Sequence, residues 1–362
     1  MNKVLLDKAL RVVSRKADAF VGRLYSIERT LDSMSMRPFE LHLELTNLCN
    51  ANCIFCPYQF QTREVRFMTD EVFFKAVNDF VDCGGGSVGL TPIVGDALID
   101  PKFVERVRYL RGRPEVDRIF VTTNAILLDK HGIDEVLQSG VTSITISTAG
   151  FDRDMYERVY RSQAYDRMKR NVTNLLKRNA ELQKPVHITI GIRSDRPLAE
   201  VMKHNDFQPI LEYNPPIDFT WSFTSANGRI TREMLPDAMR LRHVKLRIEP
   251  CVQLYNGPIV LPDGIVLGCS CVASMDALDD LGIGNILEST LAELWTNDRM
   301  KFLRSSFGST ALNATCGGCD MYREPELYRT REGRERAEVN LMRMQGKNIR
   351  REQGPSAPFS GG

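Results

Sequence analysis

The chain has 362 residues, 43% of them hydrophobic, which is enough for one large core and a small appended domain. Lys and Arg total 48 against 46 Asp and Glu, so net charge does not favour nucleic acid or an anionic membrane as a partner. No stretch approaches the roughly 18 apolar residues of a membrane span, and the N-terminus lacks a signal-peptide pattern. We therefore expect a cytoplasmic protein, in which nine cysteines favour metal binding over disulfides.

Residues 1–37 are predicted to form an N-terminal helical segment. Apolar residues such as Leu10, Phe20 and Leu31 recur among basic ones, a pattern typical of one or two amphipathic helices. We expect these helices to pack on the rest of the protein, and a helix on a membrane surface is the alternative.

From residue 38 to 240, strand-like runs alternate with helical periods, which is the pattern of parallel βα units. The predicted strands cover 40–45, 87–91, 118–122, 141–148, 186–192 and 218–222. The predicted helices cover 70–81, 103–110, 133–138 and 166–182. Because parallel barrels place their chemistry at the C-terminal ends of the strands, residues that follow these strands are the candidates for a site.

The first predicted strand is followed by three cysteines, Cys49, Cys53 and Cys56, with the spacing C-x3-C-x2-C. Three thiolates on a cluster of four irons leave one iron open, whereas a cluster used only for electron transfer is usually closed by a fourth cysteine. Zinc usually takes four ligands from paired elements, and His42 belongs to the preceding apolar segment. A zinc site and buried reduced cysteines are therefore the weaker alternatives.

This spacing, with the aromatic Phe55 before the third cysteine, resembles the signature of the radical S-adenosylmethionine (SAM) superfamily. The resemblance implies an α/β fold, a partial (β/α)6 TIM-type barrel, which agrees with the count and order of the predicted elements. It also implies a 4Fe-4S cluster on Cys49, Cys53 and Cys56, whose open iron binds the amino and carboxylate groups of S-adenosyl-L-methionine. An electron donor such as flavodoxin or ferredoxin is the implied protein partner.

Residues after the later strands match the SAM-binding positions of this family in part. Val94-Gly95-Asp96 stands where the family usually has Gly-Gly-Glu, so Asp96 retains an acceptor for the SAM ammonium group, and a plain turn is the alternative. Ser147, near the end of the fourth strand, is placed to hydrogen-bond the SAM ribose. Ala149 replaces an acidic residue of the family.

Three more polar residues at strand ends are candidates for SAM binding. Thr123 and Asn124 follow the third strand, as in the family's strand that ends in Thr-Asn. Arg193 follows the fifth strand and could pair with the SAM carboxylate in bidentate fashion. For all three, a polar group satisfied within the protein is an equally good interpretation.

Residues 241–329 contain a second cysteine set, Cys251, Cys269, Cys316 and Cys319. Pro262-Asp263-Gly264 is a predicted hairpin turn that would bring Cys251 and Cys269 together, with Gly264 free to take a positive φ. Thr290 and Glu293 have the spacing of a capping box, which would open a helix that returns the chain to Cys316.

The spacing Cys-x12-Gly-x4-Cys resembles the opening of SPASM and Twitch domains. Full SPASM domains carry seven cysteines for two auxiliary clusters, so the resemblance implies a small Twitch-type domain of a β-hairpin plus a helix. Its four cysteines would bind one auxiliary 4Fe-4S cluster. Zinc is the alternative, because these ligands also suit a tetrahedral ion.

Two cysteines and the tail remain. Cys271, two residues after Cys269, could be an alternate ligand, a buried thiol or a hydrogen-atom donor near the substrate. Cys83, at a helix end before a glycine run, is expected to be structural. Residues 330–362 are rich in Arg and Glu and end in Gly, Pro and Ser, which predicts a solvated helix followed by disorder.

The resemblance implies cleavage of SAM to a 5′-deoxyadenosyl radical that takes hydrogen from carbon. The Twitch arrangement resembles that of 2-deoxy-scyllo-inosamine dehydrogenase-like enzymes, so we expect an oxidoreductase that oxidises an alcohol of a sugar, cyclitol or natural-product intermediate. The alternatives are an epimerase that uses Cys271 as hydrogen donor, a ribosomal-peptide-modifying enzyme and a non-enzymatic cluster scaffold. Candidate substrate contacts are Asp218, Trp221, Tyr255 and Asn256.

Overall fold

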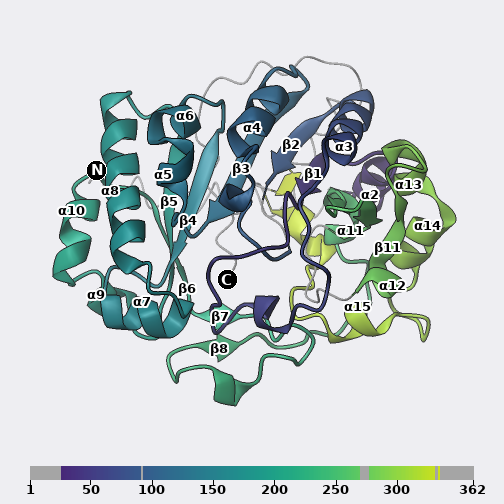
Figure 1. Cartoon of the computed structure of the whole chain (residues 1–362). Coiled ribbons are helices and arrows are strands. Elements are labelled where there is room, and N and C mark those ends of the chain that lie inside the picture. Colours follow the sequence, from purple (N-terminus) through teal and green to yellow (C-terminus); the bar gives the residue numbers. More distant parts are fainter. Residues whose placement is uncertain (1–25, 91–92, 270–276, 331–332, 335–362) are drawn as a thin grey trace, which may run out of the picture.

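The computed structural model describes residues 26–90, 93–269, 277–330 and 333–334. A nine-stranded sheet runs through it in the order β11-β10-β9-β1-β2-β3-β4-β5-β6 (Figure 1). Its six barrel strands are all parallel and cover β1 (Glu40–Leu43), β2 (Gly86–Gly89), β3 (Val116–Thr123), β4 (Ser143–Thr148), β5 (His187–Arg193) and β6 (Ile217–Thr220). The predicted α/β fold with a partial TIM-type barrel is confirmed, and each strand ends within two residues of its predicted limits.

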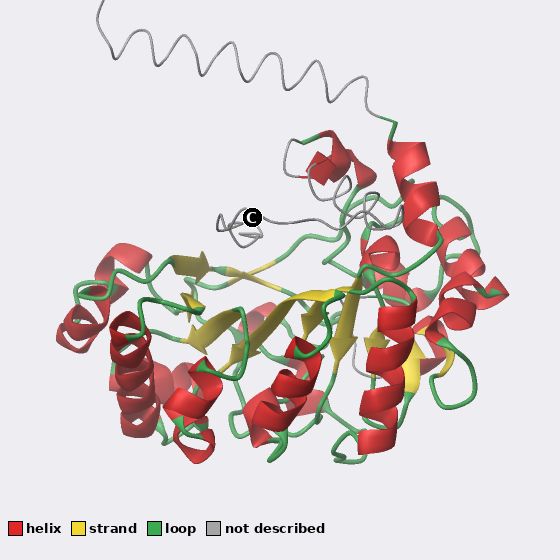
Figure 2. Ribbon diagram, turned by 90° about the horizontal axis from the view of Figure 1, so that it is seen from above, coloured by secondary structure: helices red, strands yellow, loops and turns green. Residues whose placement is uncertain are grey.

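The four helices predicted between these strands are also present, each within one residue of its predicted limits. They are α3 (Asp70–Asp82), α4 (Phe103–Arg111), α6 (Ile133–Leu137) and α8 (Tyr165–Glu181). Figure 2 shows helices along one face of the sheet. Four further helices between these strands were not predicted, namely α5 (Leu128–His131), α7 (Arg153–Tyr160), α9 (Leu198–Val201) and α10 (Gln208–Leu211).

Helix α3 illustrates why the local predictions succeed. The Thr69 hydroxyl caps the helix by accepting the Val72 N–H at 3.2 Å, and the acidic Asp70 and Glu71 lie in the first turn, where the helix dipole favours negative charge. The buried side chains recur at helical spacing. The helix ends before Gly84–Gly86, whose φ angles of 96°, 66° and 143° favour glycine.

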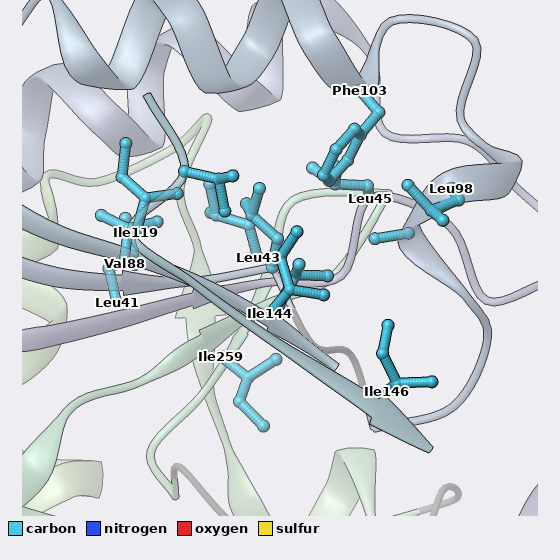
Figure 3. Packing of buried hydrophobic residues seen from close by; sticks show 14 of the residues in the cluster. Leu41, Leu43, Leu45, Val88, Leu98, Phe103, Ile119, Ile144, Ile146 and Ile259 are labelled. Atoms are coloured by element: carbon cyan, nitrogen blue, oxygen red, sulfur yellow. The ribbon is translucent and has the colours of Figure 1, made fainter. Parts of the chain in front are cut away.

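The main hydrophobic core lies between the sheet and these helices. Alternate residues of the strands, such as Leu41, Leu43, Ile144 and Ile146, are fully or almost fully buried there, and Phe103 of α4 belongs to the same cluster, next to Leu45 (Figure 3). On β4 the intervening residues 143, 145 and 147 are polar and only partly buried. Because side chains alternate along a strand, the sheet presents a polar face on the side away from the core.

The C-terminal part contains the predicted hairpin, formed by β9 (Ile259–Val260) and β10 (Ile265–Leu267). Gly264 in its turn has φ 87°, as expected. The hairpin does not stand alone, because β9 pairs with β1 in parallel and β11 (Gly282–Asn285) continues the sheet beyond β10. The predicted capping box of Thr290 and Glu293 is present and opens α13 (Leu291–Thr296).

Short elements complete this part of the chain. They are the paired strands β7 (Ser222–Phe223) and β8 (Arg240–Leu241), and the helices α11 (Gln253–Asn256), α12 (Leu278–Leu281), α14 (Asp298–Ser305) and α15 (Ala314–Gly318). In the N-terminal segment, α2 (Ile27–Ser35) packs against the protein, and the Trp295 indole N–H donates to the Met34 carbonyl at 3.2 Å. Residues 1–25 lie outside the described part. None of the helices that the structure describes combines the length and hydropathy needed to cross a bilayer.

Candidate active site

The three cysteines of the first motif lie on one loop, residues 49–56, which we call the cysteine loop. It follows β1 at the carboxyl edge of the parallel strands. Helix α7 fixes its backbone, because the N–H groups of Asn52 and Ile54 donate to the carbonyls of Tyr160 and Val159 at 3.2 and 2.9 Å. The loop is therefore tied to the end of a helix that the sequence analysis missed.

Cys49, Cys53 and Cys56 are not in disulfides. Burial raises the pKa of each thiol, to about 12 for Cys49, and each lies close enough to another for their charges to interact. Buried thiolates need a positive centre, and three thiols on one loop fit a 4Fe-4S cluster with one open iron. Among the described residues, no group of three His, Cys, Asp or Glu side chains is close enough together to bind a single metal ion. A 4Fe-4S cluster does not need such a group, because each thiolate binds a different iron of the cluster.

Arg193 ends β5 beside the cysteine loop. Burial raises the pKa of Cys53 and Cys56, and the Arg193 guanidinium opposes that rise. The guanidinium folds back over Gly191, where a Cβ would lie 2.6 Å from Nη1. In the described structure this buried Nη1 has no hydrogen-bond partner. Because an unpaired buried donor costs free energy, a bound carboxylate would be stabilised here.

Asp96 follows β2 and is only 3% exposed. Both of its carboxylate oxygens accept from the Thr123 hydroxyl at 2.9 Å, and one also accepts the Asn124 N–H at 2.8 Å. The other accepts the Leu98 N–H at 3.0 Å. Burial raises the pKa of this carboxyl group. Asp96 thus joins the ends of β2 and β3, and its contact with a SAM ammonium group stays a prediction.

Gly95 brings this segment against the start of the cysteine loop. Its φ is 97°, and a Cβ would lie 2.5 Å from the Thr46 carbonyl oxygen, so glycine alone fits this approach. The next N–H, that of Asp96, donates to the Leu48 carbonyl at 2.9 Å. In this structure Gly95 allows the segment before Asp96 to pack closely against the backbone of Thr46.

Asn124 extends the same network to the cysteines. Its side-chain amide donates to Asn50 Oδ1 at 2.6 Å and lies 3.9 Å from the Cys49 sulfur, which it can approach as a weak donor. The structure thus brings Asp96, Thr123 and Asn124 together with Cys49. Asn50 was missed by the sequence analysis, although it lies within the motif.

Ser147 lies near the end of β4 and bonds the Tyr160 hydroxyl at 2.8 Å. Tyr160 stacks on Tyr156 at 5.2 Å and meets the ring of Phe55 edge-on at 5.6 Å. The role of Ser147 at a SAM ribose and that of Phe55 at the cofactor stay predictions. The two tyrosines were missed, although their spacing of four residues after the fourth strand is a signal for one helix face.

The second cysteine set is held by the C-terminal elements. Cys251 is buried, and its sulfur accepts the Arg323 N–H at 3.4 Å. Burial raises the pKa of Cys316 to about 11, and the charge of Cys251 adds to the rise. Cys319 ends α15, and Cys269 follows β10. Their ligation of a cluster stays a prediction.

Helix α15 is fixed at its start, which orients the Cys316–Cys319 turn. Asn313 Oδ1 accepts the Cys316 N–H at 2.7 Å, and Asp280 of α12 accepts the Thr315 N–H at 2.9 Å. Cys271 lies outside the described residues, as do 270–276 around it. Its predicted role as a hydrogen donor therefore has no structural description.

The remaining candidates lie at the edges of the site or away from it. Asp218 pairs with Gly191 in the sheet, whereas Trp221 is 48% exposed on the surface. Tyr255 is buried with its ring 5.1 Å from the Arg304 guanidinium, and the Asn256 amide donates to Gln253 at 2.8 Å. Both lie in α11, and their contact with a substrate stays a prediction. Cys83 ends α3, and burial raises its pKa to about 11.

Comparison with known proteins agrees with this geometry. Residues 43–204 match the Radical SAM superfamily, and residues 251–320 match the SPASM family, an iron-sulfur cluster-binding domain. Among curated proteins, the chain is similar to the GTP 3',8-cyclase of Chlorobaculum tepidum, with 22% identity over 136 residues, 38% of this chain and 40% of that protein. The enzyme of the same name from Vibrio cholerae is 26% identical over 132 residues, 35% of this chain and 39% of that protein. The chain spans about two-fifths of the length of these relatives.

Solved structures share the fold over most of the chain. BtrN in complex with AdoMet and 2-DOIA has a TM-score of 0.52 at 16% identity, covering 78% of this chain and 92% of BtrN. Streptococcus suis SuiB bound to precursor peptide SuiA has a TM-score of 0.55 at 15% identity, covering 82% and 74%. The anSMEcpe structure with bound AdoMet has a TM-score of 0.51 at 14% identity, covering 84% and 96%.

At these identities the structural likeness establishes the fold, while the two family matches cover both cysteine sets. The radical SAM and SPASM domains imply SAM and iron-sulfur clusters as cofactors. This chain therefore contains a radical SAM domain over residues 43–204 and a SPASM-type iron-sulfur cluster-binding domain over residues 251–320.

Proposed function

We propose that this protein is a radical SAM oxidoreductase that oxidises an alcohol group of a small polar substrate, such as a sugar, cyclitol or natural-product intermediate. The observation that carries the proposal is the presence of two separate sites of buried and partly buried thiols, the cysteine loop and the pair Cys251 and Cys316. In this proposal the first site would hold the cluster for SAM cleavage. The second site would hold the acceptor of the second electron that leaves the substrate.

When bound, a reduced cluster and SAM supply the one-electron chemistry that removes a hydrogen atom from carbon. The cysteine loop would hold the first cluster, and Arg193 would pair with the SAM carboxylate. Oxidation of an alcohol to a ketone also releases a proton from oxygen, which passes to solvent, and one further electron. The second cysteine set would hold an auxiliary 4Fe-4S cluster, which would supply an acceptor for that electron. A small protein such as flavodoxin or ferredoxin supplies the electron that begins turnover.

The polar face of the sheet supports a polar substrate. Arg118 of β3 donates to the Ser143 hydroxyl of β4 at 3.4 Å, and the His187 ring lies 3.3 Å from the Thr189 hydroxyl on β5. Glu44, at the carboxyl end of β1, forms a bidentate pair with Arg63 at 2.6 and 2.9 Å. Such donors and acceptors favour hydroxyl groups over an apolar ligand.

Replacing Arg193 with methionine should weaken SAM binding about tenfold or more, because a charge-assisted hydrogen bond contributes roughly 1.5 to 3 kcal/mol. Iron content should stay unchanged. Arg196→Met is the matched control, because Arg196 already pairs with the partly buried carboxylates of Asp152 and Asp195 at 3.3 and 3.2 Å. Calorimetric titration of the reconstituted protein with SAM measures both variants, and equal affinities would remove Arg193 from the SAM site.

The reaction is tested with anaerobically reconstituted protein, a reductant, SAM and candidate metabolites. We expect formation of 5′-deoxyadenosine that depends on the substrate, and a product that lacks two hydrogen atoms. In deuterated water this product should carry no solvent deuterium at the oxidised carbon. A product of unchanged composition with one solvent deuterium, lost in a Cys271→Ala variant, would instead identify an epimerase.

A further inference from the structure

We propose that Asp320 is a positioning residue that holds the second cysteine site against the cysteine loop through residues 223–227, which we call the bridge loop. The bridge loop begins in β7 and lies between β6 and α15 at the lower edge of Figure 1. The inference rests on the proposed function in one respect, namely that both sites act on the same substrate.

At one end the bridge loop is bound by Asp320, which directly follows Cys319 and is 8% exposed. One carboxylate oxygen accepts from the Thr224 hydroxyl at 2.6 Å, and the other accepts the Ser225 N–H at 2.5 Å. Hydrogen bonds to a buried carboxylate are stronger than those between neutral groups. The Cys316–Cys319 turn and the bridge loop are therefore joined by a two-point contact between segments 95 residues apart.

The bridge loop also lies across the rest of the turn. The Asn227 side-chain amide donates to the Thr315 carbonyl at 3.4 Å, and a Cβ at Gly318 would lie 3.1 Å from Asn227 Oδ1. Ala226 and Asn227 have φ angles of 49° and 57°, which are rare for residues other than glycine. Surrounding contacts must hold such a backbone in place, and the Asp320 carboxylate provides two of them.

At its other end the bridge loop meets the first site. Phe223 is 5% exposed and stacks on Phe55 with ring centroids 4.9 Å apart. Phe55 precedes Cys56, and the hydroxyl that Asp320 binds belongs to Thr224, the neighbour of Phe223. A continuous chain of contacts therefore links the second cysteine turn to the cysteine loop, so loss of the Asp320 carboxylate should disturb SAM binding at a distance.

The test measures SAM affinity by calorimetry on reconstituted protein. It also measures the absorbance of the iron-sulfur cluster bound at the second cysteine set. Asp320→Ala should weaken SAM binding roughly fivefold or more. Thr224→Val, which removes the hydroxyl with little change in volume, should act in the same direction, and Thr224→Ser should restore affinity. Asp237→Ala is the control, because the Asp237 side chain is fully exposed and pairs at the surface with Arg232 at 3.0 Å. It should change neither the second site nor SAM affinity.

A double-mutant cycle decides whether Asp320 acts through Phe223. If it does, Asp320→Ala combined with Phe223→Ala should weaken SAM binding no more than the more severe single variant. Additive losses, or wild-type SAM affinity in both Asp320→Ala and Thr224→Val, would overturn the inference. If wild-type protein forms no oxidised product, the proposed function is refuted. The SAM affinities of the variants would still decide whether Asp320 positions the cysteine loop.

Discussion

Replacing Cys49, Cys53 and Cys56 together with alanine is expected to abolish SAM cleavage and to lower iron from about eight to about four per chain. The physical reason is that these three thiols are the whole protein ligand set of the first cluster in our proposal. Iron analysis and 5′-deoxyadenosine formation after anaerobic reconstitution measure the two effects.

The matched control for this variant is Cys83→Ala. Cys83 lies at the end of α3, outside both cysteine sets, so its removal should leave the iron content and SAM cleavage at the wild-type level. Full iron in the triple variant, or zinc in place of iron at the second site, would contradict the assignment of two 4Fe-4S clusters.

Asp96→Ala is expected to lower the free energy of unfolding by about 3 kcal/mol, because it leaves several buried donors without an acceptor. These donors are the Thr123 hydroxyl and the N–H groups of Leu98 and Asn124. SAM binding should weaken about tenfold or more, since each lost charge-assisted bond costs roughly 1.5 to 3 kcal/mol. The loss of stability comes from the hydrogen bonds at the ends of β2 and β3, and it is expected whether or not Asp96 also binds the SAM ammonium group.

Denaturant unfolding and SAM titration measure these two effects. Asp237→Ala is the control, because the Asp237 side chain is fully exposed and pairs only at the surface with Arg232 at 3.0 Å. Its effect should stay within about 0.5 kcal/mol. Wild-type stability and SAM affinity in Asp96→Ala would mean that Gly95 and Asp96 form a plain turn.

The local part of this fold could be predicted from the sequence. The helix over residues 70–82 follows from its cap, its apolar spacing and the glycine run that ends it, and the hairpin at Gly264 follows from its turn residues. The C-x3-C-x2-C motif can be identified from the spacing of its three cysteines alone. Each of these signals lies within one short segment, where propensity and periodicity act.

The contacts that complete the site were decided by the tertiary structure. Asp96 meets Thr123 across 27 residues, and Thr224 meets Asp320 across 96 residues. The hairpin strand β9 joins β1, although the sequence analysis expected it within a small appended domain. Spacing along the chain does not predict such pairs, because they depend on the register of the sheet and on the side on which each helix returns. The sequence by itself therefore determined the ligand motifs and most elements, and packing determined which buried donors and acceptors surround them.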